Sequence, residues 1–214
     1  MMNSVLLPFA EGFIATDHTM NDVTAFFKLH NDLDTLRHTL QVAGEATRLA
    51  ELYGVDPVAA EQAALLHDIS NVIPIPNMLE AAEELSISIL DEERKYSRIV
   101  HQKLSTAMAR EIFGIDDEKI LFAIECHTTF KPNASLLDRI LFVADKISWN
   151  LSGEHPYLQV MRTKADGLEL DAAILIYLNQ VWDQRKRLKL VHPWLISARE
   201  QLLGEAELRN RAER

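Results

Sequence analysis

Apolar residues recur every three or four positions along most of the chain, which is the spacing of an amphipathic helix. The clearest case begins after Asp32, where leucines and alanines keep this spacing until Gly54. Aspartate commonly caps the start of a helix, and glycine commonly follows its end. Asp56 and Pro57 then open a second helix that runs through an alanine-rich stretch to His67. The pattern therefore predicts a chain built of helices.

The same spacing continues beyond His67, interrupted by proline, glycine and capping residues. No succession of short alternating segments indicates a sheet, so we expect an all-α fold. The pattern predicts helices over residues 79–85, from Asp91 through His101 to Phe113, from Asp116 to His127, from Ser135 past Asp145, over 171–189, and after Pro193.

Length and segment order together predict the domain organisation. A chain of 214 residues is long enough to bury one sizeable core. We expect an N-terminal extension over residues 1–25, a helical core over 26–150, and C-terminal helices over 151–214 that pack on the same domain. The highly charged last residues, 205–214, are expected to fray.

Composition and charge indicate where in the cell the protein is expected and which classes of partner it is not expected to bind. Apolar residues make up 48% of the chain and charged residues 25%, as in ordinary soluble proteins. The single cysteine, Cys126, cannot form an intrachain disulfide, and residues 1–20 lack the basic start of a signal peptide. We therefore expect a soluble, cytoplasmic protein. A net charge of −10 disfavours binding to nucleic acid or to an anionic membrane.

An imidazole and a carboxylate stand next to each other at the end of an apolar run. His67 and Asp68 follow two alanines and two leucines, and burying such a pair without partners is costly. A divalent metal would satisfy both groups and would supply local positive charge for an anionic substrate. The pattern is equally compatible with a structural arrangement in which His67 ends one helix and Asp68 caps the next turn.

Four further residues of the same chemistry lie on other predicted helices. They are His38, His101, His127 and Asp145, each within an apolar frame. Any one histidine in such a position is usually a hydrogen-bonded core residue. The set as a whole predicts one shared site at which several helices meet.

The order of these residues resembles the HD superfamily of metal-dependent phosphohydrolases, whose fold is a helical bundle, here with additional C-terminal helices. Longer stretches resemble one branch of it, the YqeK-like symmetrical diadenosine tetraphosphate hydrolases. The matching stretches are Arg-His-Thr-Leu at 37–40, Leu-Ala-Glu-Leu-Tyr-Gly-Val-Asp at 49–56, Ala-Ala-Leu-Leu-His-Asp-Ile at 63–69, His-Thr-Thr at 127–129, Lys-Pro-Asn at 131–133, Ser-Leu-Leu at 135–137, Phe-Val-Ala-Asp at 142–145 and Val-His-Pro at 191–193.

The resemblance implies two metal ions. One would be held by His38, His67, Asp68 and Asp145, and Asp68 would bridge to a second ion held by His101 and His127. Iron is the metal that the family implies. Ligand chemistry alone is equally compatible with manganese, zinc or nickel, because imidazole and carboxylate together suit several first-row metals.

The resemblance also implies a reaction, in which His67 and Asp68 take part directly in catalysis. A hydroxide generated at the metals would split diadenosine tetraphosphate at its central bridge into two ADP. A nucleoside monophosphate or another phosphate ester is an alternative substrate. A nucleotide-sensing module without turnover is a third alternative, because Asn71 stands where many HD enzymes carry a phosphate-binding lysine.

Several residues near the motifs are candidates for contact with a nucleotide substrate. Asn71 can donate a hydrogen bond to phosphate, and Lys103, Lys131 and Arg139 can supply charge. Phe130 replaces a usual glycine of the resembled family, and the stretch 148–151 departs from its glutamate, proline and arginine. We expect a small nucleotide as the partner, and the sequence is compatible with a homodimer.

Overall fold

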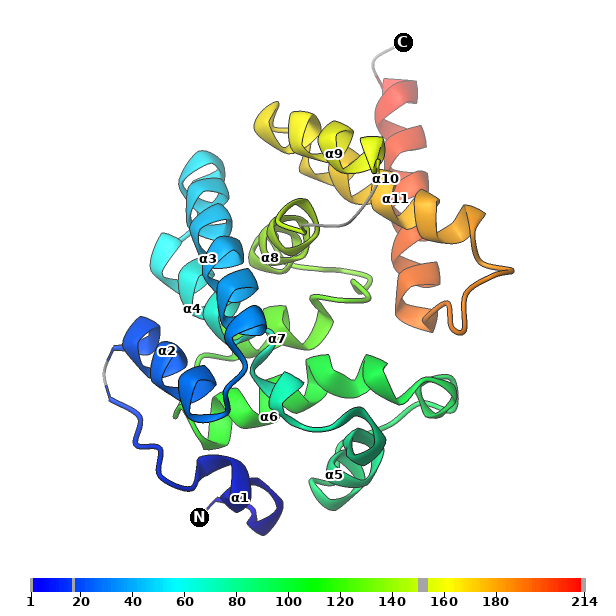
Figure 1. The fold of residues 1–214 in the computed structure, drawn as a ribbon. Helices are drawn as coiled ribbons and strands as arrows, with labels where there is room; N and C mark the ends of the chain where they lie inside the picture. The colour runs from blue at the N-terminus through cyan, green and yellow to red at the C-terminus, as the bar shows by residue number, and fades with distance from the viewer. Residues whose placement is uncertain (1, 17, 150–153, 213–214) are drawn as a thin grey trace.

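The computed structural model describes residues 2–16, 18–149 and 154–212, and these form helices joined by turns and loops (Figure 1). No strand occurs among them, so the predicted all-α fold is confirmed. The α-helices are α1 (Leu7–Ala10), α2 (Thr19–Leu29), α3 (Leu33–Tyr53), α4 (Pro57–Leu66), α5 (Met78–Glu84), α6 (His101–Glu111), α7 (Glu118–Cys126), α8 (Leu136–Ile147), α9 (Pro156–Asp166), α10 (Leu170–Asp183) and α11 (Pro193–Ala212), and the 3₁₀ turns are η1 (Ser4–Leu6), η2 (Ile69–Val72), η3 (Ile75–Asn77), η4 (Glu93–Lys95) and η5 (Ser97–Val100).

The predicted signals begin and end the hairpin of α3 and α4. Asp32 accepts a hydrogen bond from the backbone N–H of Thr35 at 3.1 Å and so caps α3. Gly54 ends α3 in the left-handed region at φ 68°, which glycine adopts without steric cost. Asp56 caps α4, whose first residue is Pro57. These signals bring α4 back along α3.

The core lies among α3, α4, α7 and α8, and α4 and α8 each contact the other three. α2 packs against α3 and α4, whereas α9 and α10 pack against α8, and α11 packs against α10. Figure 1 accordingly shows α9, α10 and α11 gathered beyond α8. None of the helices described here is both long and apolar enough to cross a membrane.

The helix predicted from Asp91 is wrong in its first half. The 3₁₀ turns η4 and η5 occupy this stretch, and α6 begins only at His101. The carboxylate of Glu93 accepts a hydrogen bond from the N–H of Leu90 at 2.7 Å, and Tyr96, at φ −148° and ψ 83°, has a backbone that is not helical. This local bond and this non-helical residue interrupt the helical bonding.

Other boundaries also differ from the prediction. α2 and α9 occupy stretches for which no helix was predicted, and α2 runs across residue 25. α10 ends at Asp183 rather than near 189, where the following arginines and lysines are exposed and have no apolar face to pack. α11 continues to Ala212, past the start of the segment predicted to fray. The boundary predicted after residue 150 lies outside the described residues.

A buried polar cluster joins the start of α11 to the turn before α6. Glu93, fully buried, accepts hydrogen bonds from Lys103 Nζ at 2.8 Å and from His192 Nε2 at 3.1 Å. His192 Nδ1 in turn accepts the backbone N–H of Trp194, so Nε2 carries the hydrogen. Burial by itself raises the pKa of Glu93, but the bonds from His192 and Lys103 outweigh it and lower the pKa to about 2.

The lowered pKa makes this cluster sensitive to acid. Stability from Glu93 is fully present above its ordinary pKa and is lost as the pH falls through about 2. We expect Glu93→Gln to lower the free energy of unfolding at pH 7 by about 3 kcal/mol. This difference from the wild type should shrink between pH 4.5 and 2, as measured by urea denaturation. Glu83→Gln, at an exposed ion pair with Arg94, is the control. A difference that stays constant down to pH 2 would contradict this expectation.

Candidate metal centre

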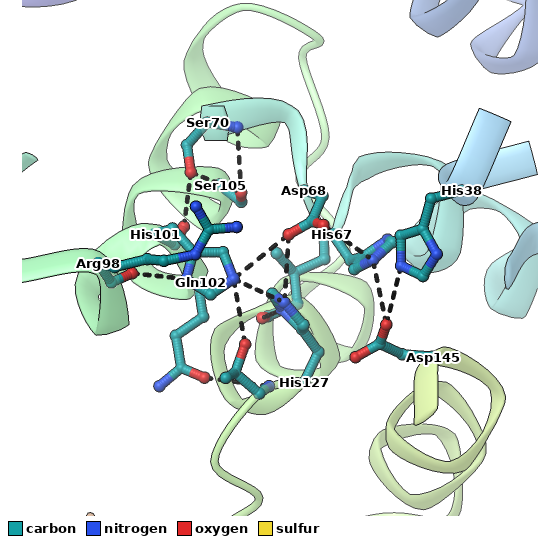
Figure 2. A network of polar contacts seen from close by, with 12 residues as sticks. His38, His67, Asp68, Ser70, Arg98, His101, Gln102, Ser105, His127 and Asp145 are labelled. Carbon is teal, nitrogen blue, oxygen red and sulfur yellow. Dashed lines mark hydrogen bonds and ion pairs between the residues drawn. The ribbon is translucent and has the colours of Figure 1, made fainter. Parts of the chain in front are cut away.

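The structure brings all six predicted ligand residues together (Figure 2). They come from five places in the bundle, and each occupies a fixed position there. His38 lies within α3, His67 and Asp68 directly follow α4, His101 begins α6, His127 directly follows α7, and Asp145 lies in the last turns of α8.

The donor atoms form a continuous series with Asp68 in the middle. On one side, Asp145 Oδ1 lies 3.0 Å from His38 Nε2 and 3.7 Å from His67 Nε2. His67 Nε2 is 3.5 Å from Asp68 Oδ2. On the other side, Asp68 Oδ1 lies 3.3 Å from His101 Nε2 and 3.5 Å from His127 Nε2.

Two sets of these residues have donor atoms close enough to share an ion. His38, His67 and Asp145 form one set, and His67, Asp68 and His127 form the other, with all donor atoms of a set within 4.8 Å. His67 therefore belongs to both sets. The resemblance instead gave the bridging role to Asp68, whose two oxygens face the two sides.

Backbone carbonyls fix the orientation of three imidazoles. The Nδ1 of His67 donates to Ala64 at 2.6 Å, and those of His101 and His127 donate to carbonyls three residues earlier, each at 2.8 Å. A carbonyl only accepts, so Nδ1 carries the hydrogen in each ring. The neutral ring then presents a lone pair on Nε2, which is the form that binds a metal.

These lone pairs provide a test of whether a metal fits. His67 Nε2 is buried and has no hydrogen-bond partner. The Nε2 atoms of His101 and His127 face each other at 3.1 Å, although both are acceptors in the neutral form. Such an arrangement is repulsive unless a cation lies among the donors. The residues therefore fit a bound divalent metal.

The electrostatics of the site favour the metal-binding form of His127 and of both carboxylates. Burial by itself lowers the pKa of His38, but the hydrogen bond and charge of Asp145 outweigh it and raise the pKa of that ring. Burial lowers the pKa of His127 to about 4, so that this ring is neutral at pH 7. Burial by itself raises the pKa of Asp68, but His67, His101 and His127 lower it well below the ordinary range. The pKa of Asp145 is also lowered, because Lys146 and His38 outweigh the effect of burial. Both carboxylates are therefore ionised.

A cavity of about 560 Å³ is lined by five of the six candidate ligands. Its volume is within the usual range for small-molecule sites. Arg37 and Arg98 are exposed along it, and Trp149 forms part of its wall. The lining residues are Asp34, Arg37, His38, Gln41, Asp68, Arg98, His101, His127, Thr128, Asp145, Lys146 and Trp149.

The four predicted substrate contacts do not line this cavity. Lys103 is buried and bonded to Glu93, and Lys131 donates to the carbonyl of Phe122. Arg139 pairs with Asp171 at a separate cavity. Asn71 has a buried side-chain oxygen without a partner and does not face the cavity. The geometry therefore does not favour substrate contact by these residues.

Phe130, which replaces a usual glycine of the resembled family, also lies away from the cavity. Its ring is 2% exposed and packs on Phe142 with centroids 4.9 Å apart. Trp149, by contrast, reaches the cavity and donates from Nε1 to Asp145 Oδ1 at 3.1 Å. Part of the divergent stretch 148–151, namely residues 150 and 151, lies outside the described residues.

Sequence reasoning missed residues that support the ligands. The buried amide of Gln102 accepts hydrogen bonds from the N–H groups of Thr128 and Thr129, and so holds the turn after His127. The Thr128 hydroxyl lies 3.1 Å from His101 Nε2. Gln102 stands in the largely polar stretch His-Gln-Lys-Leu-Ser at 101–105, so the sequence pattern gave no signal of its burial.

Comparison with known proteins agrees with this geometry. The family model of the HD domain matches residues 35–150, which contain all six residues of the site. The chain belongs to the HD-domain family. The resemblance seen in the sequence is thereby confirmed, and the protein is an HD-domain hydrolase, of a family that binds divalent metals.

The chain is similar over most of its length to three known proteins. It is 46% identical over 140 residues to an uncharacterized protein in the pepC 5' region of Lactococcus lactis subsp. cremoris, covering 65% of this chain and 70% of the relative. It is 35% identical to a symmetrical bis(5'-nucleosyl)-tetraphosphatase of Halalkalibacterium halodurans, over 79% of this chain and 89% of the relative. The crystal structure of a predicted HD superfamily hydrolase involved in NAD metabolism, from Clostridium acetobutylicum, superposes with a TM-score of 0.79 at 30% identity, covering 86% of this chain and 97% of that one.

The position of His67 in both ligand sets leads to a prediction about metal content. We expect His67→Ala to lose both ions, because its Nε2 lies in both sets, and His38→Ala to lose only one. Metal analysis of protein purified without oxygen measures the number of ions per chain. His18→Ala, outside the site, is the control. A His67→Ala protein that keeps as much metal as the wild type would contradict the shared role.

Proposed function

We propose that the protein hydrolyses symmetrical dinucleoside tetraphosphates, with diadenosine tetraphosphate as the first candidate, to two nucleoside diphosphates. The observation that carries this proposal is the pair of ligand sets sharing His67 beneath a cavity with exposed arginines. The name of the Halalkalibacterium halodurans relative supports the same substrate. Iron is the metal we propose first, with manganese, zinc and nickel as alternatives.

The ligand sets suggest how the residues divide between two ions. His38, His67 and Asp145 would hold one, and Asp68, His101 and His127 the other, with His67 close enough to contribute to both. When bound, such metals supply positive charge that polarises phosphoryl oxygens and makes a water molecule more acidic. The three bonds from Nδ1 to carbonyls keep the rings from turning as substrate binds and leaves.

The surroundings of the ligands complement a long phosphate chain. The protein as a whole carries a charge of −10, so a substrate with several phosphates requires local attraction. Arg37 lies on α3 next to His38, and Arg98 precedes the helix that starts at His101, so exposed guanidinium groups come from both sides of the centre. Guanidinium groups can bind phosphate oxygens in pairs.

The pattern of products is the direct test of the proposed function. Wild-type protein should convert diadenosine tetraphosphate to ADP alone. Asp68→Ala should be inactive, because this carboxylate lies between the two groups of ligands, with Oδ2 near His67 and Oδ1 near His101 and His127. Anion-exchange chromatography of the products measures this. Formation of AMP with ATP would contradict symmetrical cleavage, and turnover of nucleoside monophosphates only would favour a phosphate-ester substrate. Metal and nucleotide binding without turnover would favour a sensing module.

Arg98 lines the cavity and Arg139 does not, and this difference gives a second test. We expect Arg98→Gln to raise KM for the dinucleotide about tenfold, the effect of one lost charge-assisted hydrogen bond. Its kcat should change less, because Arg98 is not among the donor residues. Arg139→Gln is the comparison, since Arg139 is engaged with Asp171 outside the cavity. A larger effect on KM from Arg139→Gln would support the contact first predicted from the sequence.

A further inference from the structure

Lys146 places a buried ammonium group between two parts of the metal centre. The side chain is 1% exposed, and its Nζ lies 2.5 Å from Asp145 Oδ2. The same Nζ donates to the backbone carbonyl of His127 at 3.0 Å. One cation therefore binds the carboxylate of α8 and the backbone of the turn that follows α7.

Aromatic rings surround the other side of this ammonium. Nζ lies 4.9 Å from the ring centre of Phe142, 4.7 Å from that of Trp149 and 5.5 Å from that of Tyr177. The faces of such rings attract a cation, most strongly where water is excluded. Tyr177 belongs to α10, so a helix outside the family-model match helps to hold the charge.

The ammonium determines which oxygen of Asp145 faces the histidines. Oδ2 is engaged by Lys146, whereas Oδ1 faces His38 and His67 and also accepts the N–H of Trp149. The carboxylate is therefore presented through one oxygen. The positive charge of Lys146 also offsets one of the two negative charges, those of Asp68 and Asp145, that the donor residues contribute.

We propose that Lys146 is a positioning residue that restricts Asp145 to one-oxygen binding and weakens the hold of the centre on divalent cations. A cation near a metal repels it, and the repulsion is strong where the charges are buried. With one ligand charge offset, the bound metals keep more positive charge for a phosphate substrate. This inference rests on the proposed metal-dependent function.

Binding of Mn²⁺ alone tests the role of Lys146. The metal-stripped wild type, Lys146→Met and Lys146→Gln are titrated with Mn²⁺, and free Mn²⁺ is followed by electron paramagnetic resonance. Both variants should bind Mn²⁺ at least about tenfold more tightly, because a nearby positive charge is removed. Lys146→Arg keeps the charge and should stay near the wild-type affinity. Lys119→Met, on the exposed face of α7, repeats the same substitution away from the site.

A purely structural role of Lys146 would not lead to tighter binding of Mn²⁺ in the variants. If Lys146 only held the fold, Lys146→Met and Lys146→Gln would bind Mn²⁺ more weakly than the wild type or equally well, and either result overturns the proposal. Lys146→Gln keeps a hydrogen-bond donor, so it carries the test if Lys146→Met does not fold. Because no nucleotide is present, the result is independent of which substrate the protein cleaves. Failure of the proposed function would appear only in the product assay.

Discussion

The bond from a histidine Nδ1 to the carbonyl three residues earlier is the interaction on which the metal centre depends. It occurs at His67, His101 and His127, and in each case the carbonyl belongs to the turn that leads into the histidine. The only hydrogen of each neutral ring is donated to the backbone, so each Nε2 is left with a lone pair that can bind a metal. The helix ends thereby fix the direction of three donors before any cation arrives.

The sequence predicted the parts of the fold that local signals control. The caps at Asp32, Gly54 and Asp56 lie where the pattern placed them, because a cap needs only its own backbone neighbours. The turn around Glu93 could not be predicted in this way, because its carboxylate is drawn in by Lys103 and His192. His192, which lies directly before α11, is distant from Glu93 in the sequence.

The same distinction separates the metal ligands from the substrate contacts. The six candidate ligand residues could be predicted from the sequence because their types, order and neighbours form a motif, and the fold brings them together. Lysine and arginine have long side chains whose partners depend on tertiary packing. Lys103 and Arg139 lie away from the cavity, where they pair with Glu93 and Asp171, and Arg98, which lines the cavity, belonged to no motif. Phe130 shows a related effect. Its backbone has φ 61°, which glycine adopts more easily, and its ring packs in the core against Phe142.

The aromatic surroundings of Lys146 bear on how this protein can change during evolution. The segment that matches the family model ends at residue 150, yet Tyr177 reaches back from α10 to the ammonium beside Asp145. A recombination event that exchanged the C-terminal helices for those of another family member would thus alter the charge environment of the metal ligands while leaving every ligand in place. The unit of inheritance for the chemistry of this chain is larger than its recognisable domain.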